Sequence, residues 1–300
     1  MHALPFLLAL AAGALLAPAL ARALVDAGHT RANYRDRALP CPFGVLTLAA
    51  ALLALIPLTL LERLASVHVF VAPVFPVCIY ALGVLALGLA DDTLGRDGVA
   101  VGGRPPARGA LPPARGVPSP PRGWRGHGAA LLRGELSTGT LKAFGSLGLA
   151  LLAADSTALG GRRTGHWLLA AGVLVLATNA FNLLDLRPGR ATKAFVLLGA
   201  GLIVGAGELR ALWALGVFAA PALVAGAYDL RERALLGDTG ANLLGALAGL
   251  WLVLALSDTG QIVALALLAV ITVYGELRSI SSLIERTPGL RQLDSWGRPA

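Results

Sequence analysis

Long apolar runs constrain this chain more than any other feature of its sequence. A run of about 20 apolar residues can cross the hydrocarbon core of a bilayer as a helix, and hydrophobic residues make up 56% of the chain against 14% charged. A soluble domain could not cover so much apolar surface. The sequence therefore predicts an all-α, polytopic membrane protein in one domain, residues 1–300, with about nine transmembrane helices. The expected spans are 4–24, 43–61, 69–90, 140–154, 166–184, 194–207, 211–228, 241–256 and 261–280.

Basic residues predict the orientation of these spans. All but four of the 25 Lys and Arg lie in loops on one side, and the exceptions are Arg63, Arg162, Arg163 and Arg210. Because cytoplasmic loops are enriched in Lys and Arg, this bias predicts an N-terminus outside and a C-terminus inside. The net charge of +8 then follows from orientation and contact with anionic phospholipid, so no nucleic-acid partner is expected.

One stretch departs from the membrane pattern. Residues 99–122 contain seven prolines among Gly, Arg and Ala, without apolar periodicity. Such a composition predicts a disordered cytoplasmic insertion that carries no chemistry. The two cysteines, Cys41 and Cys78, lie on opposite sides of an apolar run without metal-ligand spacing, and we interpret them as packing residues.

Acidic residues end three of the runs on the predicted cytoplasmic side. Asp91 and Asp92 close the third run, where adjacent positions on a helix point about 100° apart, so both cannot be buried without a partner ion. At the end of the fifth run, Asn179, Asn182 and Asp185 follow an i, i+3, i+6 spacing that places them near one helix face.

The third acidic motif lies between the seventh and eighth runs. Asp229 is followed by Gly237-Asp238-Thr239-Gly240, which opens the next apolar run. The start of a helix offers free backbone N–H groups and a positive dipole end, which suit a phosphate group. Each motif alone is equally compatible with an ordinary helix end, but three acidic ends on one side of a membrane could form a single Mg²⁺ site shared with substrate phosphates.

These three motifs, in this order and topology, carry a resemblance to the polyprenyl-phosphate sugar-1-phosphate transferases of glycosyltransferase family 4. That family includes phospho-N-acetylmuramoyl-pentapeptide transferase and the undecaprenyl-phosphate GlcNAc-1-phosphate transferases. The loop from Asn33 to Gly44 is similar to the first cytoplasmic loop of the family as well. The resemblance covers essentially the whole chain.

The resemblance implies a Mg²⁺-dependent enzyme of the plasma membrane, acting in cell-wall or surface-glycan synthesis. It would transfer a sugar-1-phosphate from a UDP-sugar to undecaprenyl (polyprenyl) phosphate and release UMP, and a homodimer is left open. By position, Asp91 and Asp92 are the expected catalytic residues and Asp92 and Asp238 the expected metal ligands. The expected substrate-binding residues are Asn179, Asn182, Asp185, Arg187, Arg190, Gly237 and Thr239.

The sequence also departs from the family pattern. Pro188 stands at a position that is acidic in many relatives, and Leu235 replaces an aromatic residue used to stack uracil. No His occurs from Tyr274 to Arg298, where the family carries a His-rich loop. As cations on the same side, Arg187, Arg190, Lys142 and His127 could supply the missing phosphate contacts. Ordinary positive-inside charge is the alternative for each, and it is the favoured explanation for Lys142 and His127.

These departures leave a second function open, a catalytically silent relative that binds polyprenyl phosphate or a nucleotide sugar as a regulator or scaffold. A transporter would be a third class. It would require charged residues deep within spans or broken helices in matched halves, and the sequence has neither pattern.

Overall fold

The computed structural model describes residues 1–94, 138–161, 163–207 and 209–299. The predicted insertion 99–122 and His127 lie outside the described residues. Long helices make up most of the described chain. They are α1 (Leu4–Asp26), α2 (Val45–Leu64), α3 (Val74–Leu94), α5 (Thr138–Ala154), α6 (Thr164–Leu184), α7 (Arg190–Ala206), α8 (Arg210–Leu230), α9 (Gly237–Ala255) and α10 (Asp258–Leu277).

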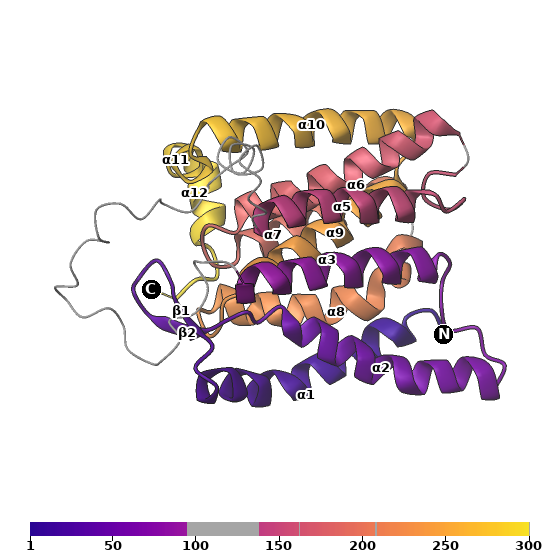
Figure 1. The fold of residues 1–300 in the computed structure, drawn as a ribbon, viewed down its shortest axis with the longest axis horizontal. Coiled ribbons are helices and arrows are strands. Elements are labelled where there is room, and N and C mark those ends of the chain that lie inside the picture. The colour runs from indigo at the N-terminus through magenta and orange to yellow at the C-terminus, as the bar shows by residue number, and fades with distance from the viewer. Residues whose placement is uncertain (95–137, 162, 208, 300) are drawn as a thin grey trace.

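Seven of these helices are long and apolar enough to cross a membrane, namely α1, α2, α3, α6, α8, α9 and α10. The remaining two, α5 and α7, have 17 residues each. The prediction of a helical, multi-pass membrane protein is confirmed in this coarser form. The count of nine spans and the N-out, C-in orientation remain predictions, and Figure 1 shows the two termini at opposite ends of the helices, as an odd number of crossings requires.

Helix α9 forms the centre of the structure. Every residue from Thr239 to Val253 is buried, and the helix packs against α3, α6, α7 and α8 (Figure 1). Glycine allows this close approach, because a Cβ on Gly245 would lie 2.6 Å from the Cα of Thr178 on α6. Small residues at helix contacts are the usual means of packing helices within a bilayer.

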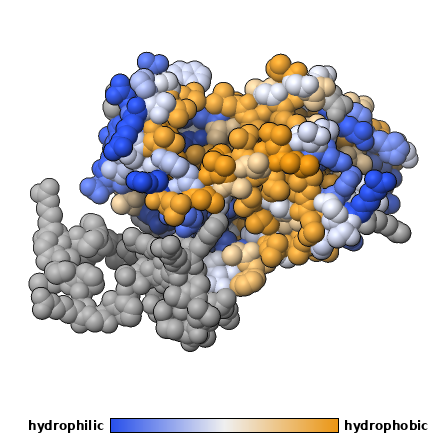
Figure 2. All heavy atoms as spheres, turned by 90° about the horizontal axis from the view of Figure 1, so that it is seen from above, coloured by the Kyte–Doolittle hydropathy of each residue, from blue (hydrophilic) through white to orange (hydrophobic). Residues whose placement is uncertain are grey.

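The outer helices present apolar side chains to their surroundings. Leu52, Ile56 and Leu60 on α2 are exposed, as are Val263, Leu267 and Val270 on α10. Figure 2 shows apolar residues over the middle of the molecule and hydrophilic residues toward both ends. A surface of this kind is stable against lipid and costly in water.

A small polar cap covers one end of the helices. A hairpin of β1 (Thr30–Ala32) and β2 (Ala38–Pro40) pairs antiparallel, with Arg31 opposite Leu39. It gathers with α11 (Ile280–Arg286), α12 (Pro288–Ser295) and the C-terminus at the same end (Figure 1). The sequence did not predict this two-stranded addition to an otherwise helical fold.

Candidate functional site

The start of α9 is fixed by the segment that follows the hairpin. The N–H of Leu235 donates to the carbonyl of Pro40, while the N–H groups of Phe43 and Gly44 donate to the carbonyls of Leu235 and Leu236, at 2.8 to 3.0 Å. A Cβ on Gly44 would lie 2.2 Å from the backbone N of Gly240, so only glycine fits there. These contacts hold the start of α9 against the segment that leads into α2.

Asp92, at the end of α3, caps this helix. Its Oδ1 accepts from the N–H of Asp238 at 3.0 Å, and its Oδ2 accepts from the N–H and the hydroxyl of Thr239 at 2.8 and 2.6 Å. Gly237 adopts φ +68°, and a Cβ there would lie 2.7 Å from Oδ2 of Asp92. The start of α9 was expected to hold a phosphate on its backbone N–H groups, but those of Asp238 and Thr239 donate to a carboxylate of the same chain.

Asp91 points elsewhere, as the 100° offset between neighbouring helix positions requires. Its Oδ2 lies 3.3 Å from Nζ of Lys142 on α5, and the same Nζ makes a shorter contact with Oδ2 of Asp238. The three side chains are 20%, 16% and 30% exposed for Asp91, Lys142 and Asp238 respectively. Three helices thus contribute one side chain each to a partly buried ionic group.

Asp185 lies just after α6 at the same end of the molecule and is partly buried. Burial, together with the negative charges of Asp229, Asp238 and Asp92, raises its pKa well above the ordinary value, while the charge of Arg31 lowers it. This mutual influence means that the acidic ends of α3, α6, α8 and α9 face a common region. We call Asp91, Asp92, Asp185, Asp229 and Asp238 the acidic cluster.

The carboxylate of Asp229 accepts hydrogen bonds from two backbone N–H groups of this region. Its Oδ2 accepts from the N–H of Gly189 at 2.6 Å, and its Oδ1 accepts from the N–H of Leu236 at 3.4 Å. Gly189 adopts φ +77°, and a Cβ there would lie 2.4 Å from Leu230. The carboxylate therefore joins the turn before α7 to the loop before α9.

The two predicted amides occupy different surroundings. Nδ2 of Asn179 donates to the hydroxyl of Thr272 on α10 at 3.3 Å, so this side chain supports a helix contact. Asn182 lies in the last turn of α6, partly buried and near Asp185 in sequence. Of the predicted i, i+3, i+6 series, Asp185 belongs to the acidic cluster, and Asn182 accepts a hydrogen bond from the N–H of Asp185 through its backbone carbonyl at 3.2 Å.

The two predicted arginines are ion-paired within the chain. Arg190 donates to both carboxylate oxygens of Asp294 at 2.7 and 3.0 Å, with side chains only 4% and 9% exposed. Arg187 pairs with Glu285 of α11 and lies over the ring of Tyr34. In this structure both guanidinium groups hold the polar cap rather than facing the acidic cluster.

Sequence reasoning did not single out two acidic residues that organise the cap. Glu232, with a side chain 1% exposed, accepts from Asn33 and Tyr34 of the hairpin and pairs with Arg35. Asp294 joins α12 to Arg190 and also pairs with Arg298. Glu232 lies in the loop beyond Asp229 and Asp294 lies beyond the last apolar run, so neither closes a run directly as Asp92 and Asp185 do.

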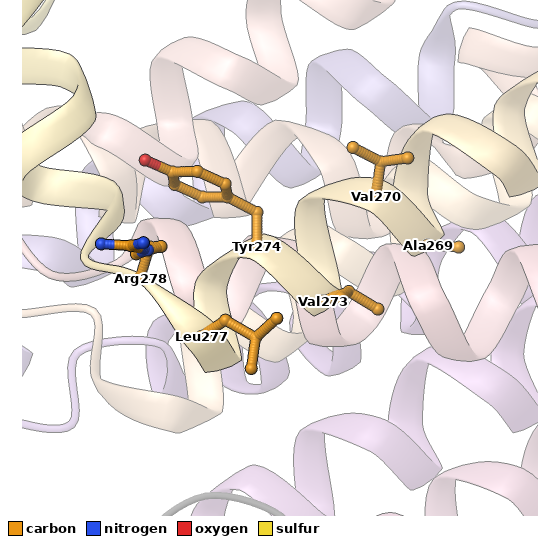
Figure 3. A pocket seen from close by; sticks show the side chains of 6 residues that line it. All are labelled: Ala269, Val270, Val273, Tyr274, Leu277 and Arg278. Atoms are coloured by element: carbon orange, nitrogen blue, oxygen red, sulfur yellow. The ribbon is translucent and has the colours of Figure 1, made fainter.

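A shallow apolar hollow lies along α10 and is shown in Figure 3. Its lining comes from Ala269, Val270, Val273, Tyr274, Leu277 and Arg278. The Tyr274 hydroxyl and the Arg278 guanidinium both point toward the end of α10 that leads into α11 (Figure 3). An apolar wall with a cation at its polar end is suited to an anionic lipid.

The described residues fit a divalent cation only in part. Asp91 and Asp238 direct one carboxylate oxygen each at a single cationic position, which is a donor set that Mg²⁺ uses when substrate phosphates complete its shell. Asp92 fits less well as a ligand, because three of its roughly four acceptor positions are used to cap α9. Within the described ranges, no group of three or more His, Cys, Asp or Glu side chains is arranged to hold a metal.

Comparison with known proteins adds no family assignment. No family model matches the chain, and no curated protein matches it. The fold and the site therefore define a helical, multi-pass membrane protein with an acidic cluster at one end, and the resemblance drawn from its motifs remains a prediction.

Proposed function

We propose that this protein is a Mg²⁺-dependent phosphoglycosyltransferase, which moves a sugar-1-phosphate from a UDP-sugar to a polyprenyl phosphate at the cytoplasmic face of the plasma membrane. The observation that supports it most is the meeting of three motifs that are distant in sequence. Lys142 contacts Asp91 and Asp238, and Asp92 caps α9 at Thr239. The negative charges of Asp238 and Asp92 help to raise the pKa of Asp185.

Catalysis of the proposed reaction depends on stabilising charge in the transition state more than on a covalent intermediate with the protein. An oxygen of the acceptor phosphate attacks the β-phosphorus of the donor, the bond from that phosphorus to the bridging oxygen breaks, and UMP leaves with that oxygen. A bound Mg²⁺ would neutralise charge on the diphosphate oxygens. Asp91 and Asp238 would hold the cation, and Asp92 would keep the start of α9 in place.

Asp185 suits a different task. Because its pKa is raised well above the ordinary value, its carboxyl group can keep a proton at a higher pH than an exposed Asp. A protonated carboxyl group can donate a hydrogen bond to a sugar or uridine oxygen, which an ionised carboxylate cannot do.

The hollow along α10 suits the acceptor lipid. Isoprenoid carbons would lie against Val270, Val273 and Leu277, and the phosphate would approach Arg278. This arrangement would bring the acceptor phosphate to the same end of the helices as the acidic cluster (Figure 1).

The test is a transfer assay with purified protein, radiolabelled UDP-GlcNAc and undecaprenyl phosphate, scored by label extracted into butanol. We expect Mg²⁺-dependent transfer and a loss of about 10²–10³ in rate for Asp91→Asn, the usual cost of one transition-state contact. Asp258→Asn is the matched control, because Asp258 is exposed at the far end of the helices, where it pairs with His166. Equal rates for both variants would contradict the proposed site.

A second function, a catalytically silent relative, is favoured by one observation. The charged groups expected to hold substrate are largely satisfied within the chain, since Lys142 lies between Asp91 and Asp238 while Arg190 is paired with Asp294. Binding of undecaprenyl phosphate or a UDP-sugar without transfer, in the presence of Mg²⁺, would favour this reading over the enzyme.

A further inference from the structure

Lys142 occupies the position at which the proposed cation would bind. Its ammonium group contacts one oxygen of Asp91 and one oxygen of Asp238, the two carboxylates best placed to hold a metal. Mg²⁺ needs oxygen ligands at about 2.0–2.1 Å and keeps near-octahedral geometry. A divalent ion and the ammonium group therefore cannot occupy this position together, and their like charges repel at such a distance.

We propose that Lys142 is the built-in counter-ion of the Asp91–Asp238 pair, and that a divalent cation binds there only by displacing its ammonium group. This inference rests on the cation of the proposed function. The lysine prevents the two partly buried carboxylates, one on α3 and one on α9, from repelling each other. Displacement leaves the lysine without its partners, so the divalent cation alone binds weakly.

A diphosphate changes this balance. Its negative charges add ligands to the cation and offer a new partner to the released ammonium group. Cation and nucleotide sugar are thus expected to bind cooperatively, each raising the affinity of the other by the same factor. The lysine makes the free protein a poor metal binder and the donor complex a good one.

Cation binding by variants provides the first test. Binding of Mn²⁺, measured by electron paramagnetic resonance on purified protein, should be at least about tenfold tighter in Lys142→Met than in the parent, because one nearby charge shifts an ionic equilibrium by about 10–10³-fold. Arg233→Met is the matched control, since Arg233 is exposed on the loop before α9 and loses the same charge. We expect its affinity to stay within about twofold, owing to screening by salt.

A second test uses the parent protein and needs no variant to fold. The chain has only two lysines, Lys142 and Lys193. Nζ of Lys193 donates to the carbonyls of Leu293, Asp294 and Trp296, away from the acidic cluster. Mild acylation read by mass spectrometry should therefore label Lys142 several-fold faster when Mg²⁺ is present at saturation, while Lys193 serves as the internal reference.

The outcomes separate this inference from the function on which it rests. Equal Mn²⁺ affinity in the parent and Lys142→Met, or unchanged labelling of Lys142 in saturating Mg²⁺, would overturn displacement while leaving a cation site in place. Failure of both proteins to bind Mn²⁺, with and without UDP-GlcNAc, would remove the cation from the proposed function and this inference with it. Tighter binding in Lys142→Met supports both.

Discussion

Replacing Asp92 with alanine should destabilise the protein much more than replacing Asp91 with asparagine. Asp92→Ala removes three hydrogen bonds at the start of α9 and leaves Thr239, whose side chain is fully buried, without its acceptor. Loss of a helix cap costs about 0.5–2 kcal/mol, and an unsatisfied buried polar group adds about 1–3 kcal/mol. The expected total is about 2–5 kcal/mol.

Asp91→Asn should cost under about 1 kcal/mol, because it weakens only the partly exposed ion pair between Asp91 and Lys142. Lys142 keeps its second ion pair, with Asp238. Thermal unfolding in detergent, followed by tryptophan fluorescence, distinguishes the two variants. At roughly 2–4 °C per kcal/mol, Asp92→Ala should melt about 4–20 °C below the parent. An unchanged melting temperature combined with lost Mg²⁺ binding would refute the capping role and make Asp92 a metal ligand.

Three further expectations address the rest of the structure. At pH 7, Asp294→Asn should cost about 3–5 kcal/mol and expose the C-terminal helices to limited proteolysis, because it breaks a buried pair with Arg190. In the parent, burial tends to raise the pKa of Asp294, but hydrogen bonds and charges from Arg190 and Arg298 outweigh burial and lower the pKa below its ordinary value. This stabilisation is therefore full above about pH 4 and is lost as the pH falls through the lowered pKa, and protease protection that does not weaken on acidification below pH 4 would contradict it. Gly88→Ala should destabilise by about 1–3 kcal/mol in the same melting assay, since its Cβ would lie 2.6 Å from a backbone oxygen of α9, whereas Gly148→Ala, with nothing within 4 Å, should stabilise by up to about 1 kcal/mol. Burial raises the pKa of the Cys41 thiol to about 12, so it should resist maleimide at pH 8, and rapid modification would mean that the loop before α2 opens.

The helices could be predicted well because the bilayer fixes their length and composition. The run 166–184 corresponds to α6 (Thr164–Leu184), and the run 4–24 corresponds to α1 (Leu4–Asp26). The last run, 261–280, was placed less well, since α10 ends at Leu277 and the chain then turns into α11. Residues after the final span carry no bilayer constraint, so their short helices left no comparable pattern.

The site could be predicted only in outline. Acidic residues at three run ends indicated a common location, but not which oxygen faces which helix. Asp91 and Asp92 are neighbours with different partners, because α5 lies on one side of α3 and the start of α9 on another. Arg190 and Asp294 are separated by 104 positions, and only the folded chain brings them together.

The fate of the donor's β-phosphorus tests the central claim most directly. Purified protein is incubated with undecaprenyl phosphate, Mg²⁺ and UDP-GlcNAc carrying ³²P in the β-phosphate, and lipid and water-soluble products are separated. The proposed function predicts that the label enters the butanol phase in a one-to-one ratio with UMP released, and that Asp238→Asn lowers both together. Release of labelled UDP, or no labelled lipid at any Mg²⁺ concentration while undecaprenyl phosphate still binds, would contradict phosphoglycosyl transfer.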